Sequence, residues 1–419
     1  MVIYDVRIIN QMNTFKIFTF ITVFCLYGCA ATGSLLVPLE SIEPPSGKYG
    51  IGTQVYFWED KKRGEVYTTD PTDFRELMVQ IWYPANKNTA YQKTPHVTFP
   101  EKSIAIIAKS AGLPTNFGKH GIQLKSNSVQ GLSPVSDKKF PLILFSHGDG
   151  GLLTQNTSQV EELVSNGYVV IACNHTYNAS ISFDKDNEPV LYKQNVKWNE
   201  QAQYHKKYYT NKLINYRYED LAFLLDQLKE DLLQNGNKNP YKDIIDFKNV
   251  GAMGHSMGGG TTYIGMLKDK NIKAGVAFDG WFYGLLEKDM ASDTKKPFLH
   301  LGQEQFLDPD IVGDINGSKS GKENFKIYNS MLQNNKESYG VYIKNSLHYS
   351  YTDLKLIYDP NKPLALPLKS LGEVDKSLVD KVMDETILSF FDYTLKNNQF
   401  KFDGFNTYNN QVIYKTYPK

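Results

Sequence analysis

The sequence predicts an α/β protein with a mostly parallel central sheet covered by helices on both faces. Three observations lead to this fold class. Short apolar runs alternate with amphipathic helical stretches through most of the chain, as in successive strand and helix units. The run Phe140–Phe145 is apolar throughout, as in a strand buried on both faces. Another run ends in the pattern Gly254-x-Ser256-x-Gly258, which is typical of a tight turn between a strand and a helix.

Composition and charge are those of a globular protein. The chain has 419 residues, of which 41% are hydrophobic and 22% are charged, so it can bury a sizeable core. The formal net charge of +1 supplies no broad positive field, which argues against a nucleic-acid partner. Beyond residue 29 the chain contains one cysteine, Cys173. A disulfide inside the folded body is therefore excluded, and we expect Cys173 to be a small buried residue.

Residues 1–28 are predicted to be a secretory signal of the lipoprotein type. A short basic start near Met12 precedes the apolar run Ile17–Leu26, which is shorter than a membrane span. The first eleven residues fit a signal poorly, which leaves Met12 open as the start. The run leads into Leu-Tyr-Gly-Cys, ending at Cys29, and this order resembles a bacterial lipobox whose cysteine receives the lipid. An uncleaved anchor and an ordinary signal peptide are the alternatives.

The residue after Cys29 is not aspartate, the residue that retains some lipoproteins at the inner membrane. We therefore expect export across that membrane and lipid anchoring through Cys29 at the outer membrane or cell surface of a bacterium. Residues 29–46 contain several prolines and no periodic pattern. They are predicted to form a tether.

The first part of the folded body is predicted to hold two strands and an irregular insertion. Gly52–Trp58 and Arg75–Tyr83 have strand-like patterns, and the charge-rich residues 59–66 between them are predicted to be a loop. Residues 84–138 are rich in Lys, Pro, Gly and Ser, with one apolar patch at Ile104–Ala108. We expect an insertion with a short helix here, forming a wall or lid of the site.

The remaining elements alternate between strands and helices. We expect one domain over residues 47–397, because no internal repeat or change in composition divides it. Residues 398–419 are polar and are predicted to be a surface tail or an edge strand. The predicted strands after Phe140–Phe145 are Tyr168–Cys173, Asn249–Met253, Ala274–Phe278, Pro297–Leu301 and Ser338–Lys344, and the predicted helices are Gln159–Ser165, Asn215–Leu233, Thr261–Lys268, Glu323–Asn334 and Lys376–Leu395.

Ser256 is the predicted nucleophile. A serine on a sharp strand-to-helix turn exposes its hydroxyl at the sheet edge, and the flanking glycines lack the β-carbons that would block close packing of the turn. The Met257 amide and the positive end of the following helix come next to it. The strand Phe140–Phe145 leads into Ser-His-Gly-Asp-Gly-Gly. Esterases and lipases place oxyanion-binding amides in a loop of this kind.

A histidine base is expected after Ser256 in the chain, because a serine hydroxyl needs a proton acceptor at neutral pH. His255 is only the neighbour of the serine in the turn. His300 lies within an apolar strand and is expected to be a core residue. His348 follows the last predicted strand on a loop, which makes it the expected base.

The carboxylate that orients the base has two candidates. Asp279 ends one predicted strand, and Asp308 follows the next one. Both positions lie at the carboxyl edge of a parallel sheet. Sequence order alone leaves both open.

Four motifs follow one another in the chain: Phe145-Ser146-His147-Gly148, Gly254-His255-Ser256-Met257-Gly258-Gly259, Phe278-Asp279-Gly280-Trp281 and His348-x-x-Tyr351-x-Asp353. They resemble those of the plasma and intracellular type II platelet-activating factor acetylhydrolases, in the same order and over about residues 50 to 391. The resemblance implies the α/β-hydrolase fold and selects Asp279 as the acid, because in this family the acid precedes a small residue and Trp. It also implies oxyanion donors at the amides of Asp149 and Met257, and calcium-independent cleavage of short or oxidised acyl chains from phospholipids, without metal or cofactor.

Two departures widen the functional prediction. Asp149 stands where the plasma enzymes have an apolar residue, and its carboxylate would repel a developing oxyanion unless it points away. The turn at Ser256, with Thr261, also resembles that of bacterial cutinases and polyester hydrolases. We predict a serine carboxylester hydrolase of the acetylhydrolase kind, acting on a small-molecule or lipid ester. A cutinase-like, polyester or dienelactone hydrolase-like esterase is the alternative, and a non-catalytic surface-binding lipoprotein is the alternative from another class.

Overall fold

The structure is a computed structural model. It describes residues 30–87, 92–110, 112–195, 206–230, 241, 243–291, 294–307, 319–335, 337–359, 361–363, 369–399, 408 and 410–418. The chain divides into two compact units, which are described separately. The smaller unit comprises Met1–Ser41, Pro95–Lys125 and Ile357–Leu368, and the larger one comprises Ile42–Thr94, Ser126–Leu356 and Lys369–Lys419.

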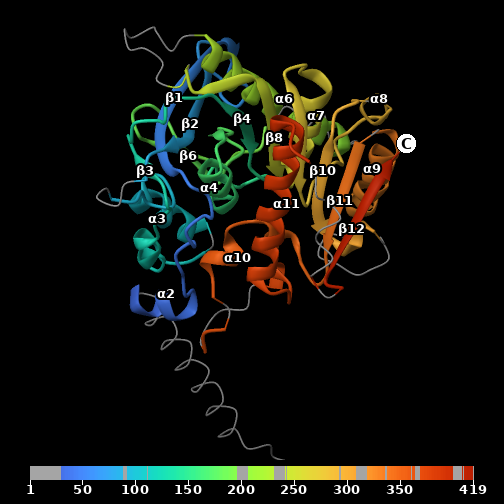
Figure 1. The fold of residues 1–419 in the computed structure, drawn as a ribbon. Coiled ribbons are helices and arrows are strands. Elements are labelled where there is room, and N and C mark those ends of the chain that lie inside the picture. The colour runs from blue at the N-terminus through green and yellow to red at the C-terminus, as the bar shows by residue number, and fades with distance from the viewer. Residues whose placement is uncertain are drawn as a thin grey trace, which may run out of the picture. The chain divides into compact units, whose positions relative to one another are not determined.

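The larger unit is built on a mostly parallel sheet (Figure 1), as the sequence predicts. Among the described residues, ten strands form this sheet in the order β12-β11-β10-β9-β8-β4-β5-β2-β1-β3. The pairs from β11 to β5 are parallel, and β2 and β12 join them antiparallel. The strands are β1 Gly50–Gly64, β2 Phe74–Ala85, β3 Val129–Gln130, β4 Phe140–Ser146, β5 Val169–Asn174, β8 Ile245–His255, β9 Ile272–Phe278, β10 Phe298–Gln303, β11 Glu337–Ile343 and β12 Val412–Pro418, with a separate hairpin of β6 Ile181–Phe183 and β7 Pro189–Leu191.

Two pairs of helices cover opposite faces of the sheet. Helix α4 packs on α11, and α6 packs on α7. A β-carbon at Gly251 would point at Phe391 of α11, whereas the next residue, Ala252, belongs to the core shared with α6 and α7. Successive side chains of a strand point to opposite faces, so the two pairs lie on opposite sides. The helices of the larger unit are α4 Thr157–Ser165, α6 Lys206–Lys229, α7 Met257–Lys268, α8 Glu287–Met290, α9 Lys319–Asn334, α11 Lys376–Lys396 and the 3₁₀ turns η4 Glu304–Phe306, η5 His348–Tyr351 and η6 Lys369–Leu371, and α10 Leu354–Ile357 begins in it.

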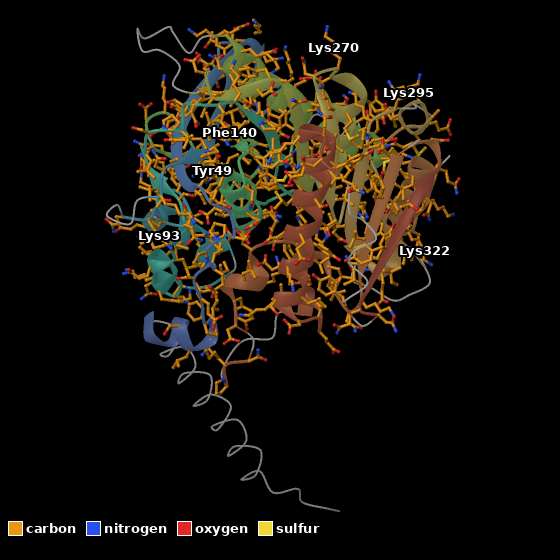
Figure 2. All side chains as sticks on the ribbon, viewed as in Figure 1. Tyr49, Lys93, Phe140, Lys270, Lys295 and Lys322 are labelled. Atoms are coloured by element: carbon orange, nitrogen blue, oxygen red, sulfur yellow. The ribbon has the colours of Figure 1, made fainter. Side chains whose placement is uncertain are left out.

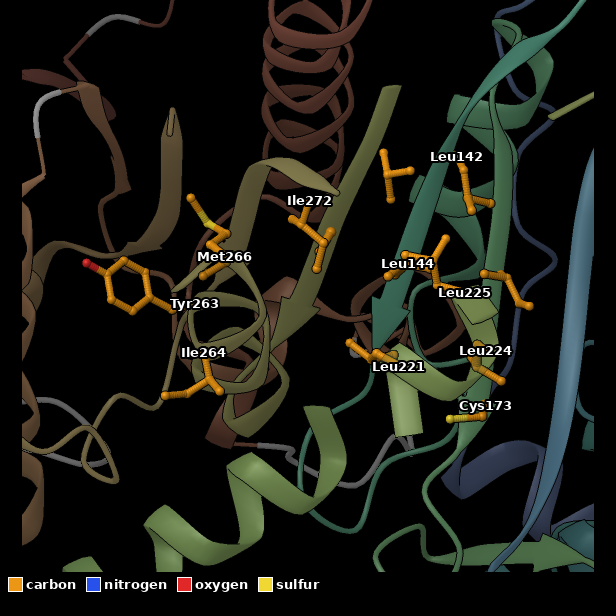
Figure 3. Close-up of a cluster of buried hydrophobic side chains, with 14 of the residues drawn as sticks. Leu142, Leu144, Cys173, Leu221, Leu224, Leu225, Tyr263, Ile264, Met266 and Ile272 are labelled. Carbon is orange, nitrogen blue, oxygen red and sulfur yellow. The ribbon is translucent and has the colours of Figure 1, made fainter. Parts of the chain in front are cut away.

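The core under α6 and α7 is apolar and close-packed (Figure 3). Leu142 and Leu144 of β4 meet Leu221, Leu224 and Leu225 of α6 there. Burial of side chains of this size is worth about 1.5 to 3 kcal/mol each. At the N-terminal end of β4, Tyr49 packs edge-on against Phe140 at 5.4 Å between ring centroids (Figure 2).

In the larger unit, the loop predicted for the charge-rich residues 59–66 is wrong for residues 59–64. They continue β1 to Gly64. Arg63 donates to Asp60 at 2.6 Å and to Asp220 of α6 at 2.8 Å. Arg63 is thus paired, whereas Lys61 and Lys62 stay exposed, so β1 can continue without burying an uncompensated charge. At the other end of the chain, residues 412–418 form the edge strand β12.

The smaller unit contains α2 Ala30–Leu36, α3 Pro100–Ser110 and the 3₁₀ turn η1 Lys119–Gln123. The apolar patch predicted as a short helix lies within α3. Ile104 packs over Gly118 and Gly121, and His120 Nε2 is 2.7 Å from the Val37 carbonyl oxygen. Across both units, no described helix is long and apolar enough to cross a membrane. The signal predicted over residues 1–28, Cys29 and Asp308 lie outside the described residues.

Candidate active site

Ser256 occupies the predicted turn between β8 and α7 with a strained backbone, φ 54° and ψ −120°. Non-glycine residues rarely adopt a positive φ, and such strain is common at functional positions. A β-carbon at Gly254 would overlap the Gly258 carbonyl, and one at Gly258 would overlap the Ser146 carbonyl. Both glycines are therefore required for β4, β8 and α7 to meet at this point.

The Ser256 backbone is bonded to the segment that follows β9. Its amide donates to the Phe278 carbonyl at 2.9 Å, and its carbonyl accepts from the Trp281 amide at 2.8 Å. Asp279 lies between these two residues in the chain. The predicted nucleophile and the predicted acid are thus held together by the backbone at the carboxyl edge of the sheet.

Asp279 and His348 are brought together as predicted. His348 Nδ1 lies 2.5 Å from Asp279 Oδ2. The same oxygen accepts from Gln303 Nε2 at 2.7 Å, and Oδ1 accepts from the Gln303 amide at 3.2 Å. Burial alone would raise the pKa of Asp279, but the hydrogen bond and charge of His348 and the Gln303 side chain outweigh it, so the pKa is lowered. The carboxyl group stays ionised although its side chain is fully buried.

The loop after β4 lies next to Ser256. A β-carbon at Gly148 would be 3.4 Å from the Ser256 β-carbon. In the described part of the chain, neither the Asp149 amide nor the Met257 amide donates a hydrogen bond within the protein. The Asp149 side chain is exposed and its Oδ2 accepts from the Tyr192 hydroxyl at 3.2 Å. The carboxylate is therefore bound to the β7 end of the hairpin.

A buried ionic network supports the loop after β4 at His147. Arg217 of α6 donates to the His147 carbonyl, and the His175 amide donates to His147 Nε2 at 3.0 Å. His175 also contacts Asp220 through Nδ1 at 2.8 Å, and Arg75 pairs with Asp220 at 2.8 Å. The backbone at His147 is thus fixed by side chains that are themselves buried and paired.

Three groups of this network are close enough to hold a metal ion, namely Cys173, His175 and Asp220. Each group already has another partner or is unsuited to the role. Asp220 binds Arg75 and Arg63, and His175 uses Nδ1 for Asp220. Burial raises the pKa of the Cys173 thiol, whereas a metal needs the thiolate. Asp220 and His175 are thus already engaged with each other and with two arginines.

Further residues around the site, some of them singled out from the sequence and some not, hold the His348 loop and its surroundings in place. Tyr351 of η5 is buried, and its hydroxyl lies 2.8 Å from Ser346 Oγ. The Asp353 carboxylate accepts from the first amides of α4, with Thr157 at 2.6 Å. His300 is a buried core residue as predicted; its Nε2 accepts from the Gly280 amide at 3.1 Å. Gln303 was missed, since a glutamine at a strand end carries no sequence signal of its own.

Comparisons with known proteins agree with the motifs. The family model described as platelet-activating factor acetylhydrolase, isoform II, matches residues 40–412. The platelet-activating factor acetylhydrolase of Cavia porcellus is 25% identical over 280 residues, which cover 62% of this chain and 58% of that protein. That of Canis lupus familiaris is 24% identical over 367 residues, covering 82% and 75%. A probable 1-alkyl-2-acetylglycerophosphocholine esterase of Arthroderma benhamiae is 23% identical over 300 residues, covering 67% and 69%.

Solved structures support the fold. A ferulic acid esterase from Streptomyces cinnamoneus aligns with a TM-score of 0.67 and 21% identity, over 90% of this chain and 99% of that one. At this identity the likeness concerns the fold alone, and it agrees with the predicted α/β-hydrolase fold. The match to the Cavia porcellus protein spans little more than half of that relative's length.

Proposed function

Because the chain belongs to the platelet-activating factor acetylhydrolase isoform II family, we propose that it hydrolyses carboxylic esters with Ser256 as its nucleophile. The observation that carries the proposal is the hydrogen bond of 2.5 Å between His348 Nδ1 and the buried Asp279 carboxylate. A carboxylate that accepts from Nδ1 leaves Nε2 of the ring as the proton acceptor. A serine hydroxyl needs such an acceptor to become nucleophilic at neutral pH.

In the proposed reaction, His348 Nε2 takes the proton of the Ser256 hydroxyl while the hydroxyl oxygen attacks the ester carbonyl carbon. The carbonyl oxygen becomes an oxyanion, which the amides of Asp149 and Met257 and the positive end of α7 stabilise. The intermediate then collapses, and His348 gives its proton to the leaving alcohol. Water, deprotonated by His348, attacks the acyl-enzyme, and the acid leaves as Ser256 regains its proton.

The Asp149 side chain is compatible with an oxyanion-binding amide at this residue. A carboxylate inside the hole would repel the developing charge. Its hydrogen bond with Tyr192, at 3.2 Å, gives it a partner on the hairpin. We infer that the amide serves the oxyanion while the side chain stays with Tyr192.

We propose a short-chain acyl ester as the substrate, in particular an ester of a phospholipid. The support is the names of the relatives, which are acetylhydrolases and a probable 1-alkyl-2-acetylglycerophosphocholine esterase. A cutinase-like, polyester or dienelactone hydrolase-like specificity is the alternative. Acetyl-phospholipid, long-chain ester and polyester substrates separate these proposals when their kcat/KM values are compared.

Replacement of Ser256 by Ala tests the nucleophile directly. We expect hydrolysis of p-nitrophenyl acetate to fall to background while the circular dichroism spectrum is unchanged. Ser338→Ala is a matched control, because Ser338 is buried and its hydroxyl has no hydrogen-bond partner in the described part of the chain. Turnover retained in Ser256→Ala would contradict the proposal, and loss in both variants would point to misfolding.

We propose that Cys29 is lipidated and anchors the protein to a membrane. The support is the Leu-Tyr-Gly-Cys order that ends the apolar run. When the full chain is expressed in a bacterium, palmitate label should be found in the wild type and not in Cys29→Ser, which should move to the soluble fraction. Equal labelling of the two would contradict the proposal.

A further inference from the structure

Two side chains link the loop after β4 to the loop that carries His348. The Gly148 amide donates to Gln155 Oε1 at 3.0 Å. Gln155 Nε2 lies 2.5 Å from His255 Nδ1, and His255 Nε2 lies 3.1 Å from the His348 carbonyl oxygen. We call this chain of three hydrogen bonds the Gln155–His255 link. It passes beside Ser256, whose neighbour in the chain is His255.

The direction of each hydrogen bond is fixed by its two ends. The Gly148 amide can only donate, so the Gln155 atom facing it must be the oxygen. The other Gln155 atom is then the NH₂ group, and His255 Nδ1 must accept from it. The His348 carbonyl can only accept, so His255 Nε2 must carry the hydrogen. The link therefore requires a neutral His255 with its proton on Nε2.

The burial of His255 agrees with this requirement. His255 is 2% exposed. Burial, together with the charge of His348, lowers the pKa of His255 to about 3, so the ring stays neutral at the pH of the proposed reaction. The rings of His255 and His348 are 4.5 Å apart between centroids. His255 thus contacts the base through its ring as well as through the backbone.

The glycines of the loop after β4 leave the space that the link occupies. A β-carbon at Gly151 would overlap Gln155 Oε1, and one at Gly148 would lie only 3.0 Å from His255 Nδ1. The Gln155 backbone carbonyl also accepts from the Asp353 amide at 2.9 Å. Gln155 is thereby attached at both its side chain and its backbone to the segments on either side of the site.

We propose that Gln155 and His255 are positioning residues that hold the oxyanion-binding loop and the His348 loop at a fixed separation on the two sides of Ser256. This inference rests on the proposed function of Ser256 and His348. Neither residue needs to contact the substrate. The link acts because transfer of the Ser256 proton and binding of the oxyanion require His348 and the Asp149 amide to be placed correctly at the same moment.

The first test replaces Gln155 with Met, which keeps a similar shape and removes both side-chain hydrogen bonds. We expect kcat for p-nitrophenyl acetate to fall about tenfold to a hundredfold, with KM almost unchanged, because misplaced groups slow the chemistry more than they weaken binding. The matched control is Gln159→Met in α4, since Gln159 also makes side-chain hydrogen bonds, to Asp380 and Asp384, but is not part of the link. Equal kcat values in the two variants would overturn the proposal.

A pair of His255 variants keeps the proposal testable if one of them folds poorly. Gln at this position can still donate to the His348 carbonyl with its NH₂ group, whereas Leu cannot. His255→Gln should therefore retain more kcat than His255→Leu. In a double-mutant cycle, His255→Leu combined with Gln155→Met should cost less than the sum of the single losses, because both break the same link. Additive losses would contradict the link.

The deciding readout does not depend on activity. Nitrogen NMR of protein labelled at histidine, with His255 assigned from its variant, should show a neutral ring protonated on Nε2 at pH 7. The same signal should change in Gln155→Met and stay in Gln159→Met. A His255 protonated on Nδ1 would overturn the proposal. Failure of the proposed function would instead appear as turnover retained in Ser256→Ala, whatever the state of His255.

Discussion

The acid side and the base side of the site are held in different ways. Asp279 follows β9 directly, and Gln303 at the end of the neighbouring strand β10 supplies both a side-chain and a backbone donor to its carboxylate. His348 follows β11 on a loop, which is held by the bond of His255 to the His348 carbonyl and by the bond of Asp353 to the Thr157 amide of α4.

This difference shows that the register of the sheet can position residues at strand ends but cannot position residues on a loop. Neighbouring parallel strands bring Asp279 and Gln303 together because the backbone ladder of β9 and β10 already aligns them. A loop has no such ladder, so its position depends on hydrogen bonds to distant residues. We therefore expect activity to be lost at the acid when the charge or orientation of one residue changes. At the base, we expect activity to be lost when the hydrogen bonds between the His348 loop and distant residues are removed.

The largest expected effect comes from removing the charge on the acid side. Asp279→Asn should lower kcat about ten-thousandfold, because an amide holds the base in the wrong tautomer. Asp308→Asn is the matched variant and should remain close to wild type in the same steady-state assay. The opposite ranking would identify Asp308 as the acid.

A smaller effect is expected from the residue that holds the acid. Gln303→Met removes the donor at 2.7 Å from Asp279 Oδ2 and should lower kcat about tenfold, as for the loss of one hydrogen bond to a charged group. Gln305→Met is the matched control, since Gln305 is also buried and its Oε1 lacks a hydrogen-bond partner in the described part of the chain. If both variants keep full kcat, the acid is held by the sheet alone.

The smallest effect on turnover, and a clear one on stability, is expected at His300. Burial lowers its pKa to about 3, whereas in the unfolded chain it is about 6.5. Between these pH values the unfolded state binds the extra proton, so stability falls as the pH is lowered, by about 1.4 kcal/mol per pH unit. His300→Gln retains an acceptor for the Gly280 amide but does not titrate.

Urea denaturation at pH 7.5 and 5.0 measures this difference. The wild type should lose about 2 kcal/mol more stability than His300→Gln between the two pH values. An equal loss in the two proteins would mean that His300 is protonated in the folded state.

The sequence predicts the fold correctly where a residue pattern is compatible with only one local structure. The apolar run at Phe140–Phe145 becomes the central strand β4, and the glycines around Ser256 mark the turn because their β-carbons would collide with backbone. The charges at residues 59–66 mislead the prediction, because Arg63 is paired with Asp60 and Asp220 and the exposed lysines lie on a strand rather than in a loop.

Within the site, the predicted pairing of Asp279 with His348 appears in the structure, while their catalytic roles remain proposals. The supporting residues could not be found from the sequence. Gln155 and Gln303 are common residues with no motif, and their partners are distant in the chain. The sequence identifies His255 only as the neighbour of the serine, because its contact with the His348 carbonyl exists only in the folded chain.

The most direct test of the central claim is the site of covalent modification. After reaction with a fluorophosphonate probe, peptide mass spectrometry should place a single adduct on Ser256, and neither Ser256→Ala nor heat-unfolded protein should react. An adduct on another residue, or an unlabelled wild type that still hydrolyses p-nitrophenyl acetate, would contradict the account.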